Sequence, residues 1–378
     1  MLIITTQGRV DFLYLNEQDM VDAGVMDMQA CIDVMEGVFE LLSEQDYRMG
    51  GRNNNSRGMV VSFPDEPVHE TMPANGPDRR FCAMPAYLGS DYRIAGCKWY
   101  GSNIDNKDKN LPRSILTMNL NDADTGAPLA FMSANLLSAW RTGAIPGVGV
   151  RHLAKKDSKV VAVLGAGAIG HSTAEALLLE VKQAEVFKIY DVDANQSQAL
   201  KQELEATFPR VTIHIVDTIE DAVRESDVIN LATSGEANPM IESEWIKPGA
   251  LIIGSSSGQF DPDFIIKNAH LVVDNWKMYE EVTYEDVYPY NSLEMGVLGR
   301  LFLDWIHEDR MTDELITNIG VIMNGTVPAR ESDDDIIIFA LGGQPVYDIA
   351  WGYRIYQNAL DKGIGTKLNL WETAYQVR

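Results

Sequence analysis

The strongest constraint on the fold is a glycine-rich turn in the middle of the chain, between a strand-like run and a helix-like run. Residues 160–164 are apolar and mostly β-branched, and Gly165, Gly167 and Gly170 follow them in the spacing G-x-G-x-x-G. In this pattern the first glycine permits a tight turn, the second lets a phosphate approach the backbone, and the third allows helix and strand to pack closely. Residues 165–170, including Ala168 and Ile169, are therefore predicted to bind a phosphate group at the start of a helix.

The region from residue 159 onward alternates β-branched runs with helical periodicity. Runs that predict strands occur at 159–164, 185–190, 211–216, 227–232, 250–254 and 270–274. Helical segments at 170–181, 195–208 and 219–226 lie between them and have the length that crossovers between parallel strands require. This α/β pattern predicts the doubly wound parallel sheet of a Rossmann dinucleotide-binding domain.

An acidic residue ends the second of these strands. Asp191 lies 21 positions after Gly170 (191 − 170), where a carboxylate can accept hydrogen bonds from the adenosine ribose hydroxyls. A 2′-phosphate would face this negative charge, and residues 192–196 supply no Arg or Lys to offset it. The position therefore predicts NAD, rather than NADP, as the cofactor.

Small hydroxyl residues follow two of the later strands. Thr233 comes after the fourth strand and Ser255 after the fifth, and both are expected at the carboxyl edge, where a doubly wound sheet holds its ligand. Their side chains can contact the ribose or the nicotinamide, and a plain turn role remains an equal alternative for each of them.

The segments on either side of this region predict an α+β domain. Before it lie a helix near 28–43, a loop rich in Gly and Asn at 50–58, and strands around 81–84, 94–99 and 115–119. After it come a strand at 336–341 and a helix at 346–360 that stops at Gly363. Because six strands already complete the doubly wound sheet, this tail is expected to return to the first domain.

Charge and composition exclude several classes of partner and chemistry. Asp and Glu outnumber Lys and Arg by 55 to 31, which gives a net charge of −24 and argues against nucleic-acid and anionic-membrane partners. The six histidines show no metal-ligand spacing and no Ser-His-Asp pattern appears, so neither a metal site nor acyl transfer is expected.

The cysteines and the N-terminal residues predict a cytoplasmic protein. Cys31, Cys82 and Cys97 show no C-x-x-C spacing, and an odd number without a signal peptide suits a reducing compartment. The uncharged stretch 125–140 is too short and polar to span a bilayer. Together these features predict a soluble protein.

Segments outside the predicted Rossmann domain resemble a known family. These segments are 96–103, with Lys98-Trp99; 121–130, with N-D-x-x-T-G; and 136–144, with Trp140-Arg141-Thr142. In this order, and followed by the glycine motif, they resemble the ornithine cyclodeaminase/mu-crystallin family. The resemblance implies a substrate-binding and dimerisation domain built from residues 1–140 and 328–378 around an NAD domain at 141–327, and it implies a homodimer.

The same resemblance implies the substrate site. In such enzymes a lysine and two arginines hold the substrate carboxylate beside the nicotinamide, and the matching positions are Lys98, Arg141 and Arg52, with Arg48 as the rival to Arg52. A guanidinium suits this role because its planar fork binds a carboxylate through two hydrogen bonds. Thr142 would reach the cofactor phosphates, with packing inside a helix as the alternative role.

The chain departs from the ornithine cyclodeaminases at one position. They place a catalytic Asp after the fifth strand, whereas this chain has Gly254-Ser-Ser-Ser-Gly there, and Asp261 lies too far along. The expected activity is therefore an NAD-dependent oxidoreduction at the Cα–N bond of an amino or imino acid with a free carboxylate. The segment 80–89 resembles the branch of the family that acts on N-substituted amino acids. Ornithine cyclisation and ligand storage of the mu-crystallin type remain the alternatives.

Overall fold

The computed structural model describes residues 8–233, 238–290 and 297–375. The chain forms two compact units. The terminal unit contains both chain ends and comprises Met1–Asp27, Glu44–Ser138 and Gln344–Arg378. The central unit comprises Met28–Ser43 and Ala139–Gly343.

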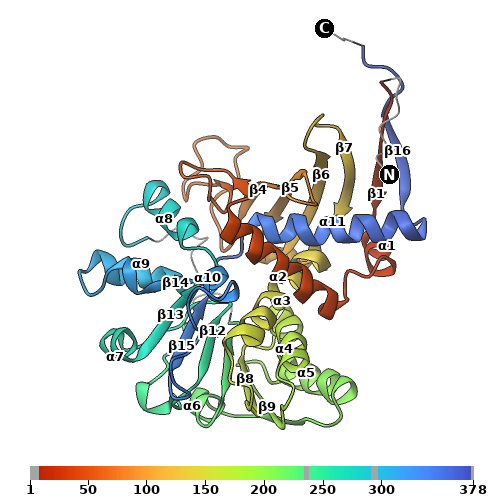
Figure 1. Cartoon of the computed structure of the whole chain (residues 1–378). Helices are drawn as coiled ribbons and strands as arrows, with labels where there is room; N and C mark the ends of the chain where they lie inside the picture. The colour runs from red at the N-terminus through yellow and green to blue at the C-terminus, as the bar shows by residue number, and fades with distance from the viewer. Residues whose placement is uncertain (1–7, 234–237, 291–296, 376–378) are drawn as a thin grey trace. The chain divides into compact units, whose positions relative to one another are not determined.

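The terminal unit is built on a mixed sheet, which within the described residues has eight strands in the order β16-β1-β7-β6-β5-β4-β2, with β3 paired to β4. The strands are β1 (Val10–Leu15), β2 (Tyr47–Met49), β3 (Met59–Ser62), β4 (Arg80–Leu88), β5 (Ile94–Ser102), β6 (Ser114–Asp122), β7 (Pro128–Ser133) and β16 (Thr366–Trp371). Only β1 and β7 among the described pairs in this sheet run parallel. Figure 1 shows β1 and β16 running side by side, which joins the two ends of the chain.

Helix α11 (Pro345–Lys362) packs on one face of this sheet, against β4, β5 and β6. Gly352 lies so close to Met118 of β6 and Leu137 that a Cβ atom would collide with the Met118 side chain, and this brings helix and sheet together. The helix ends at Gly363, which adopts a left-handed conformation (φ 66°) as predicted. The short helices α1 (Glu17–Asp22) and η1 (Ile104–Lys109) complete the unit.

The central unit contains a parallel sheet with the order β10-β9-β8-β11-β12-β15-β13-β14 among the described residues. Its strands are β8 (Val160–Leu164), β9 (Val186–Tyr190), β10 (Thr212–Ile215), β11 (Val228–Leu231), β12 (Leu251–Gly254), β13 (Ala269–Val273), β14 (Ile316–Asn318) and β15 (Ile336–Ala340). The six predicted strands are confirmed, each to within one residue at either end. The strand order reverses between β8 and β11, the point at which such sheets bind their ligand.

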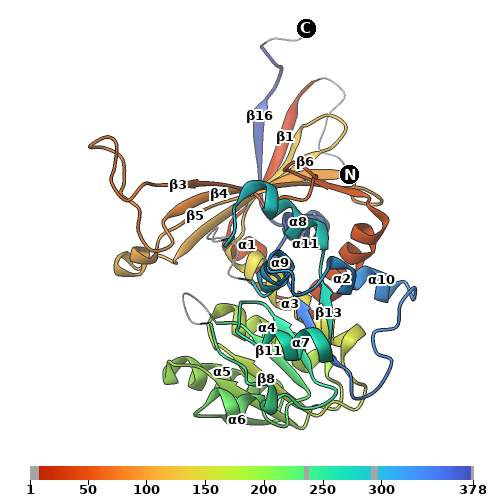
Figure 2. The same ribbon diagram turned by 90° about the vertical axis from the view of Figure 1, so that its left-hand side faces the viewer.

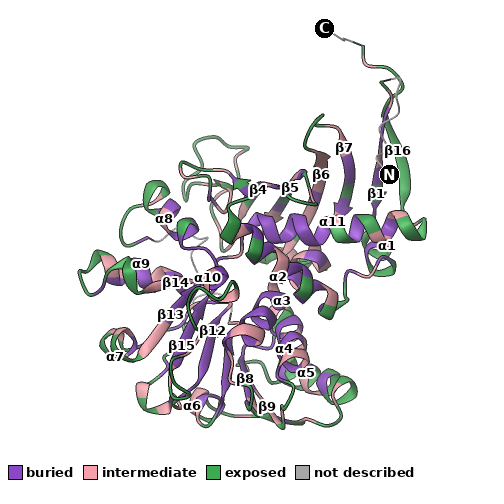
Figure 3. Ribbon diagram, viewed as in Figure 1, coloured by how far each residue is buried: buried purple, intermediate pink, exposed green. Residues whose placement is uncertain are grey.

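Helices flank this sheet: α2 (Met28–Glu44), α3 (Asn135–Leu153), α4 (Ala168–Glu180), α5 (Ala194–Thr207), α6 (Ile219–Val223), α7 (Pro262–Asn268), α8 (Trp276–Glu285), α9 (Gly299–His307) and α10 (Ile319–Met323), with short turns η2 (Ser243–Trp245) and η4 (Asp313–Leu315). Figure 3 shows the strands β8 and β12 buried, as expected for a parallel sheet covered on both faces.

The prediction that the tail returns whole to the first domain is wrong for its strand. β15 lies between β12 and β13 and pairs in parallel with both, so it belongs to the central unit, and only α11 and β16 belong to the terminal unit. All five of its residues are buried, because neighbouring strands and the layers above and below enclose it. The division between the units therefore falls at Gly343–Gln344 rather than near residue 328.

Helix α2 also lies outside the domain in which the sequence prediction placed it. Most of it clusters with the central unit, where Gly147 of α3 packs against the side chain of Ile32. Arg151 of α3 binds Asp33 and Glu36 of α2 at 2.9 and 2.6 Å. These contacts tie α2 to the α3 layer.

The sequence patterns do not predict helix α8. Its residues Trp276, Met278, Tyr279 and Val282 are buried in the core of the central unit. The acidic residues between them obscure the helical spacing of these apolar side chains.

Candidate active site

Each glycine of the predicted turn has a separate structural role. Gly165 adopts a positive φ of 106°, and a Cβ atom there would collide with the carbonyl of Ala232. A Cβ at Gly170 would collide with the carbonyl of Gly165. A Cβ at Gly167, in contrast, would meet no atom within 4 Å. The turn thus leaves open space only at Gly167, where a pyrophosphate would approach the backbone.

Helix α4 begins directly at this open position. Gly167 is its N-cap and provides no side-chain hydrogen bond, and the first turn, with Ala168 and Ile169, contains no acidic residue. The unpaired backbone N–H groups and the positive end of the helix dipole favour an anion at this end. The residues present therefore fit a dinucleotide pyrophosphate.

Asp191 supports the glycine turn from the neighbouring strand. Its Oδ2 accepts a hydrogen bond from the backbone N–H of Ala166 at 2.6 Å, and its Oδ1 accepts one from Asp193 N–H at 2.7 Å. Asp193, not Asp191, caps α5 by accepting from the N–H of Asn195. The carboxylate is therefore held beside the turn, where the adenosine ribose would bind.

The predicted hydroxyl residues lie together at the carboxyl edge of β11 and β12. The backbone N–H and the hydroxyl of Thr233 both lie 3.1 Å from Ser256 Oγ. Asn230 of β11, which is fully buried, donates from Nδ2 to Ser255 Oγ at 3.0 Å. Sequence reasoning did not identify Asn230, because an amide inside an apolar strand run carries no signal of its own.

Arg141 and Thr142 lie on α3, which crosses the start of α4. Gly143 packs so closely on Ser172 that a Cβ would collide with it, and Ser172 Oγ donates to the carbonyl of Ala139 at 3.0 Å. This contact places Thr142 next to the first turns of α4, near the predicted phosphate site. Arg141 is 5% exposed, so its charge lies inside the protein.

Lys98 lies on β5 of the terminal unit and is 3% exposed, which excludes the alternative of a solvated strand residue. Its Nζ forms an ion pair with Asp348 Oδ2 of α11 at 2.9 Å and donates to Ser138 Oγ at 3.2 Å. The ring of Tyr100 lies 5.8 Å from Nζ. Sequence reasoning missed Asp348, which resembles an ordinary polar residue near the start of an amphipathic helix.

The loop arginines differ in their surroundings. Arg48 donates to the carbonyls of Gln45 and Tyr47, so it serves its own loop. Arg52 is exposed on the same loop, which is closed by a bridge between Gly50 and Ser56. A third arginine, Arg57, was not considered from the sequence.

Arg57 is half-buried and stands just before β3. The next residue, Gly58, packs against the backbone of Ala83 and the side chain of Met84 in β4. Met84 pairs with Lys98 of β5. Extending the pairing of β3 with β4 by one residue puts Gly58 opposite Met84 and so at the level of Lys98, whereas Arg57 lies one residue further along.

The residues that directly follow β12 include no acidic side chain, and Asp261 has a different role. It accepts hydrogen bonds from the N–H groups of Asp263 and Phe264 and so caps helix α7. Residues 255–257, which follow β12, are all serines.

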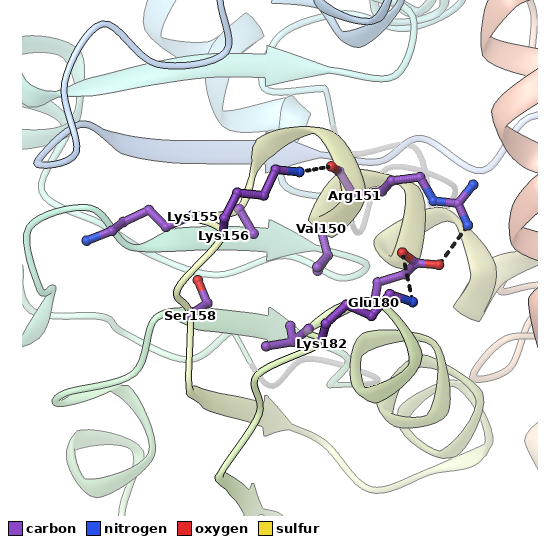
Figure 4. Close-up of a pocket in the computed structure, with 9 residues that line it drawn as sticks. Val150, Arg151, Lys155, Lys156, Ser158, Glu180 and Lys182 are labelled. Carbon is purple, nitrogen blue, oxygen red and sulfur yellow. Dashed lines mark hydrogen bonds and ion pairs between the residues drawn. The ribbon is translucent and has the colours of Figure 1, made fainter.

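A pocket of about 210 Å³ lies at the edge of the central sheet opposite the glycine turn (Figure 4). It is not a suitable site for the oxidoreduction that the sequence predicts. It lies beside Ser158, just before β8, away from the glycine turn. Its cations serve the structure: Lys156 donates to the carbonyl of Arg151, and Arg151 binds Glu180, whose hydrogen bond is the main cause of a raised Arg151 pKa. Within the described residues no group of three or more metal-ligating side chains is present.

Comparison with known proteins gives a consistent result. The family model described as "Ornithine cyclodeaminase/mu-crystallin family" matches residues 24–363. The chain is 29% identical to the N-((2S)-2-amino-2-carboxyethyl)-L-glutamate dehydrogenase of Staphylococcus aureus over 96% of this chain and 99% of that protein. It is 33% identical to the alanine dehydrogenase of Archaeoglobus fulgidus over 76% of this chain and 82% of that protein.

Among solved structures, an archaeal alanine dehydrogenase dimer with bound NAD is similar, with a TM-score of 0.76 and 25% identity. The match covers 96% of this chain and all of that one.

Proposed function

The chain belongs to the ornithine cyclodeaminase/mu-crystallin family, and we propose that its substrate is an N-substituted α-amino acid, of the kind formed by joining an amine to a 2-oxo acid. It is an NAD-dependent oxidoreductase that acts on the Cα–N bond of an amino or imino acid. The Staphylococcus aureus relative, which is matched along nearly its whole length, is named for an N-substituted glutamate. This name favours a secondary amine over a primary amine as the substrate.

The central unit carries the cofactor site. NAD, when bound, accepts or supplies the hydride exchanged with the substrate Cα. The glycine turn and the start of α4 bind its pyrophosphate, Asp191 binds the adenosine ribose, and Thr233 and Ser255 face the carboxyl edge where the nicotinamide lies. The open space at Gly167 is the observation that carries this assignment.

The substrate carboxylate is held by Lys98 and Arg141, with Arg52 as the third cation. Lys98 and Arg141 are both buried, and burying a charge is costly unless a partner of opposite charge compensates it. A fixed carboxylate orients Cα toward the nicotinamide, and such orientation supplies much of the rate enhancement in two-substrate reactions. The carboxylate of Asp348 lies 2.9 Å from Lys98 Nζ and favours the ammonium form, which suits binding of a carboxylate.

Cyclisation of ornithine is disfavoured, because the acid it requires after β12 is replaced by serine and Asp261 caps α7. Matched relatives whose names state an activity include dehydrogenases and reductases, which argues against a pure ligand store.

The test is a screen of the purified protein by NADH absorbance. We expect NADH oxidation with a 2-oxo acid plus an amino acid as amine donor, and NAD reduction with the corresponding N-substituted amino acid. Turnover of primary amino acids alone would show that the substrate is a simple amino acid and not an N-substituted one. No absorbance change with any amino acid, opine or cyclic imine would overturn the assignment.

We also propose that the protein is a homodimer joined through the sheet face of the terminal unit that α11 leaves open. Large apolar side chains are exposed along neighbouring strands of this sheet: Tyr14, Met59, Val61, Phe81, Trp99, Ile115, Phe131, Leu368 and Leu370. Phe81 and Trp99 stack with centroids 5.9 Å apart, and β3, β4 and β5 lie side by side in Figure 2. An apolar patch of this extent on a polar protein is typical of a subunit interface.

We place the protein in the cytoplasm. The three cysteines show no C-x-x-C spacing, and their odd number suits a reducing compartment. No helix in the described part of the chain is long and apolar enough to cross a membrane.

A further inference from the structure

A buried ion pair joins the predicted substrate-binding lysine to the helix that covers its sheet. Lys98 Nζ lies 2.9 Å from Asp348 Oδ2, and the two side chains are 3% and 0% exposed. Both belong to the terminal unit, and the residues of α11 around Asp348, from Pro345 to Gly352, are buried. We propose that Asp348 is a positioning residue, whose carboxylate holds the Lys98 ammonium charged and correctly placed for the carboxylate of the substrate.

Stability alone explains the pair poorly. Two charges lose their hydration when they are buried, and their mutual attraction often only offsets that loss, so apolar residues of similar size would serve the fold as well. The neighbours of Lys98 across the sheet, Met84 and Met118, show that this layer is otherwise apolar. A charge in such a layer indicates a function that needs it.

The position of Asp348 suits a negative charge despite its burial. Asp348 lies in the first turn of α11, an 18-residue helix, where the positive end of the helix dipole stabilises a negative charge. Opposite it, the Lys98 ammonium is directed by groups from three elements: Asp348 of α11, Ser138 of α3 and the Tyr100 ring of β5. Because a lysine side chain has four flexible bonds, such contacts are needed to fix one orientation.

On the assumption of the proposed function, Asp348 offsets the charge of Lys98 itself, 2.9 Å away. Without Asp348 the buried ammonium would lose this partner and the orientation that the ion pair gives it.

The test compares Asp348→Asn and Asp348→Glu with a matched control, Asp11→Asn. Asp11 is a buried carboxylate of the same unit that pairs with Arg9 and Lys367 on β1 and β16. For Asp348→Asn we expect KM for the amino acid to rise by about tenfold or more, with kcat less affected and NADH affinity unchanged. In the pH profile of kcat/KM for this variant, the alkaline limb should move to lower pH by about one unit, because the Lys98 ammonium loses its partner.

Asp348→Glu should restore part of the affinity, and the control should keep wild-type kinetics whatever its melting temperature. Unchanged KM and pH profile in a folded Asp348→Asn protein would overturn the proposal, as would an equal effect of the control.

A second measurement separates this proposal from the proposed function. The pH dependence of Lys98 acetylation by acetic anhydride, followed by peptide mass spectrometry, needs no substrate. A labelling midpoint that falls by about one pH unit in Asp348→Asn supports the positioning role even if no amino acid is turned over. An unchanged midpoint contradicts it.

Discussion

At the scale of single residues, we propose that Asp191 decides which cofactor is used. Its carboxylate is fixed by the N–H groups of Ala166 and Asp193, so it cannot move away from a 2′-phosphate. We expect Asp191→Asn to raise KM for NAD by about tenfold. The variant should also prefer NAD over NADP less strongly, because the charge that repels the 2′-phosphate is removed.

Asp193→Asn is the matched control, since Asp193 caps α5 and lies two residues away. It should leave the ratio of NAD to NADP activity unchanged. A preference for NAD that survives Asp191→Asn intact would show that another group reads the ribose.

The loop arginines allow a second comparison between neighbouring residues. Arg52→Ala should raise KM for the amino acid substrate by about tenfold or more, because a carboxylate loses a two-pronged partner. Arg48→Ala should change KM little, since its guanidinium binds carbonyls of its own loop. If Arg52→Ala behaves as wild type, Arg57 becomes the candidate for the third cation, and steady-state kinetics of all three variants will decide.

At the scale of elements, two glycines of the turn are expected to have different roles, Gly170 in folding and Gly167 in cofactor binding. Gly170→Ala should destabilise the protein by at least about 1–3 kcal/mol, because the new methyl group collides with the Gly165 carbonyl. Gly167→Ala has free space around its Cβ and should melt like the wild type without cofactor, yet lose NADH affinity. Melting curves with and without NADH measure both effects. Normal NADH binding by Gly167→Ala would place the pyrophosphate elsewhere.

Asp227 provides a pH-dependent clamp between two strands of the central sheet. It accepts hydrogen bonds from the N–H groups of Lys159 and Val160 and from Lys247; burial acts to raise its pKa, but these bonds outweigh it and the pKa is lowered. A carboxyl whose folded-state pKa is lowered stabilises the fold above its unfolded pKa, near 4, and loses this contribution as pH falls through the folded value.

Asp227→Asn should therefore lower the free energy of unfolding by about 1.5–3 kcal/mol at pH 7, the usual range for hydrogen bonds to a charged group. The difference from wild type should shrink below pH 4, which urea titrations at several pH values will show. A difference that is the same at pH 3 and pH 7 would exclude the ionic clamp.

Local patterns in the sequence predict elements well, but not which elements become neighbours. Six of the eight strands described in the central sheet follow from their β-branched runs, and α11 follows from its apolar spacing and Gly363. β15 was recognised as a strand, yet its place between β12 and β13 depends on pairing with segments more than 60 residues away. Parallel strands carry no turn signal that reveals such a partner.

The same limit applies to the site. Gly165–Gly170 and Asp191 could be predicted because the spacing of one continuous segment encodes their geometry. Asp348 and Lys98 are 250 positions apart, and only the folded sheet brings them within 2.9 Å.

At the scale of the whole molecule, the open sheet face of the terminal unit predicts self-association. Trp99→Glu places a charge in the middle of the apolar patch, next to Phe81, and should convert a dimer of about 84 kDa, twice the 42.0 kDa chain, to a monomer. Light scattering coupled to size exclusion gives the mass. Val192→Glu, at an exposed apolar residue of the central unit, is the control and should stay dimeric. A monomeric wild type, or a dimeric Trp99→Glu protein, would contradict this interface.

The most direct measurement follows the hydride itself. The purified protein is supplied with NADH deuterated at the transferred C4 position, a 2-oxo acid and an amino acid as amine donor, and the product is analysed by mass spectrometry. We expect one deuterium at the new Cα–N carbon of an N-substituted amino acid for each NADH consumed, and no such product with Lys98→Ala. Formation of proline and ammonia from ornithine without net NADH consumption, or the absence of any deuterated product, would contradict the proposed activity.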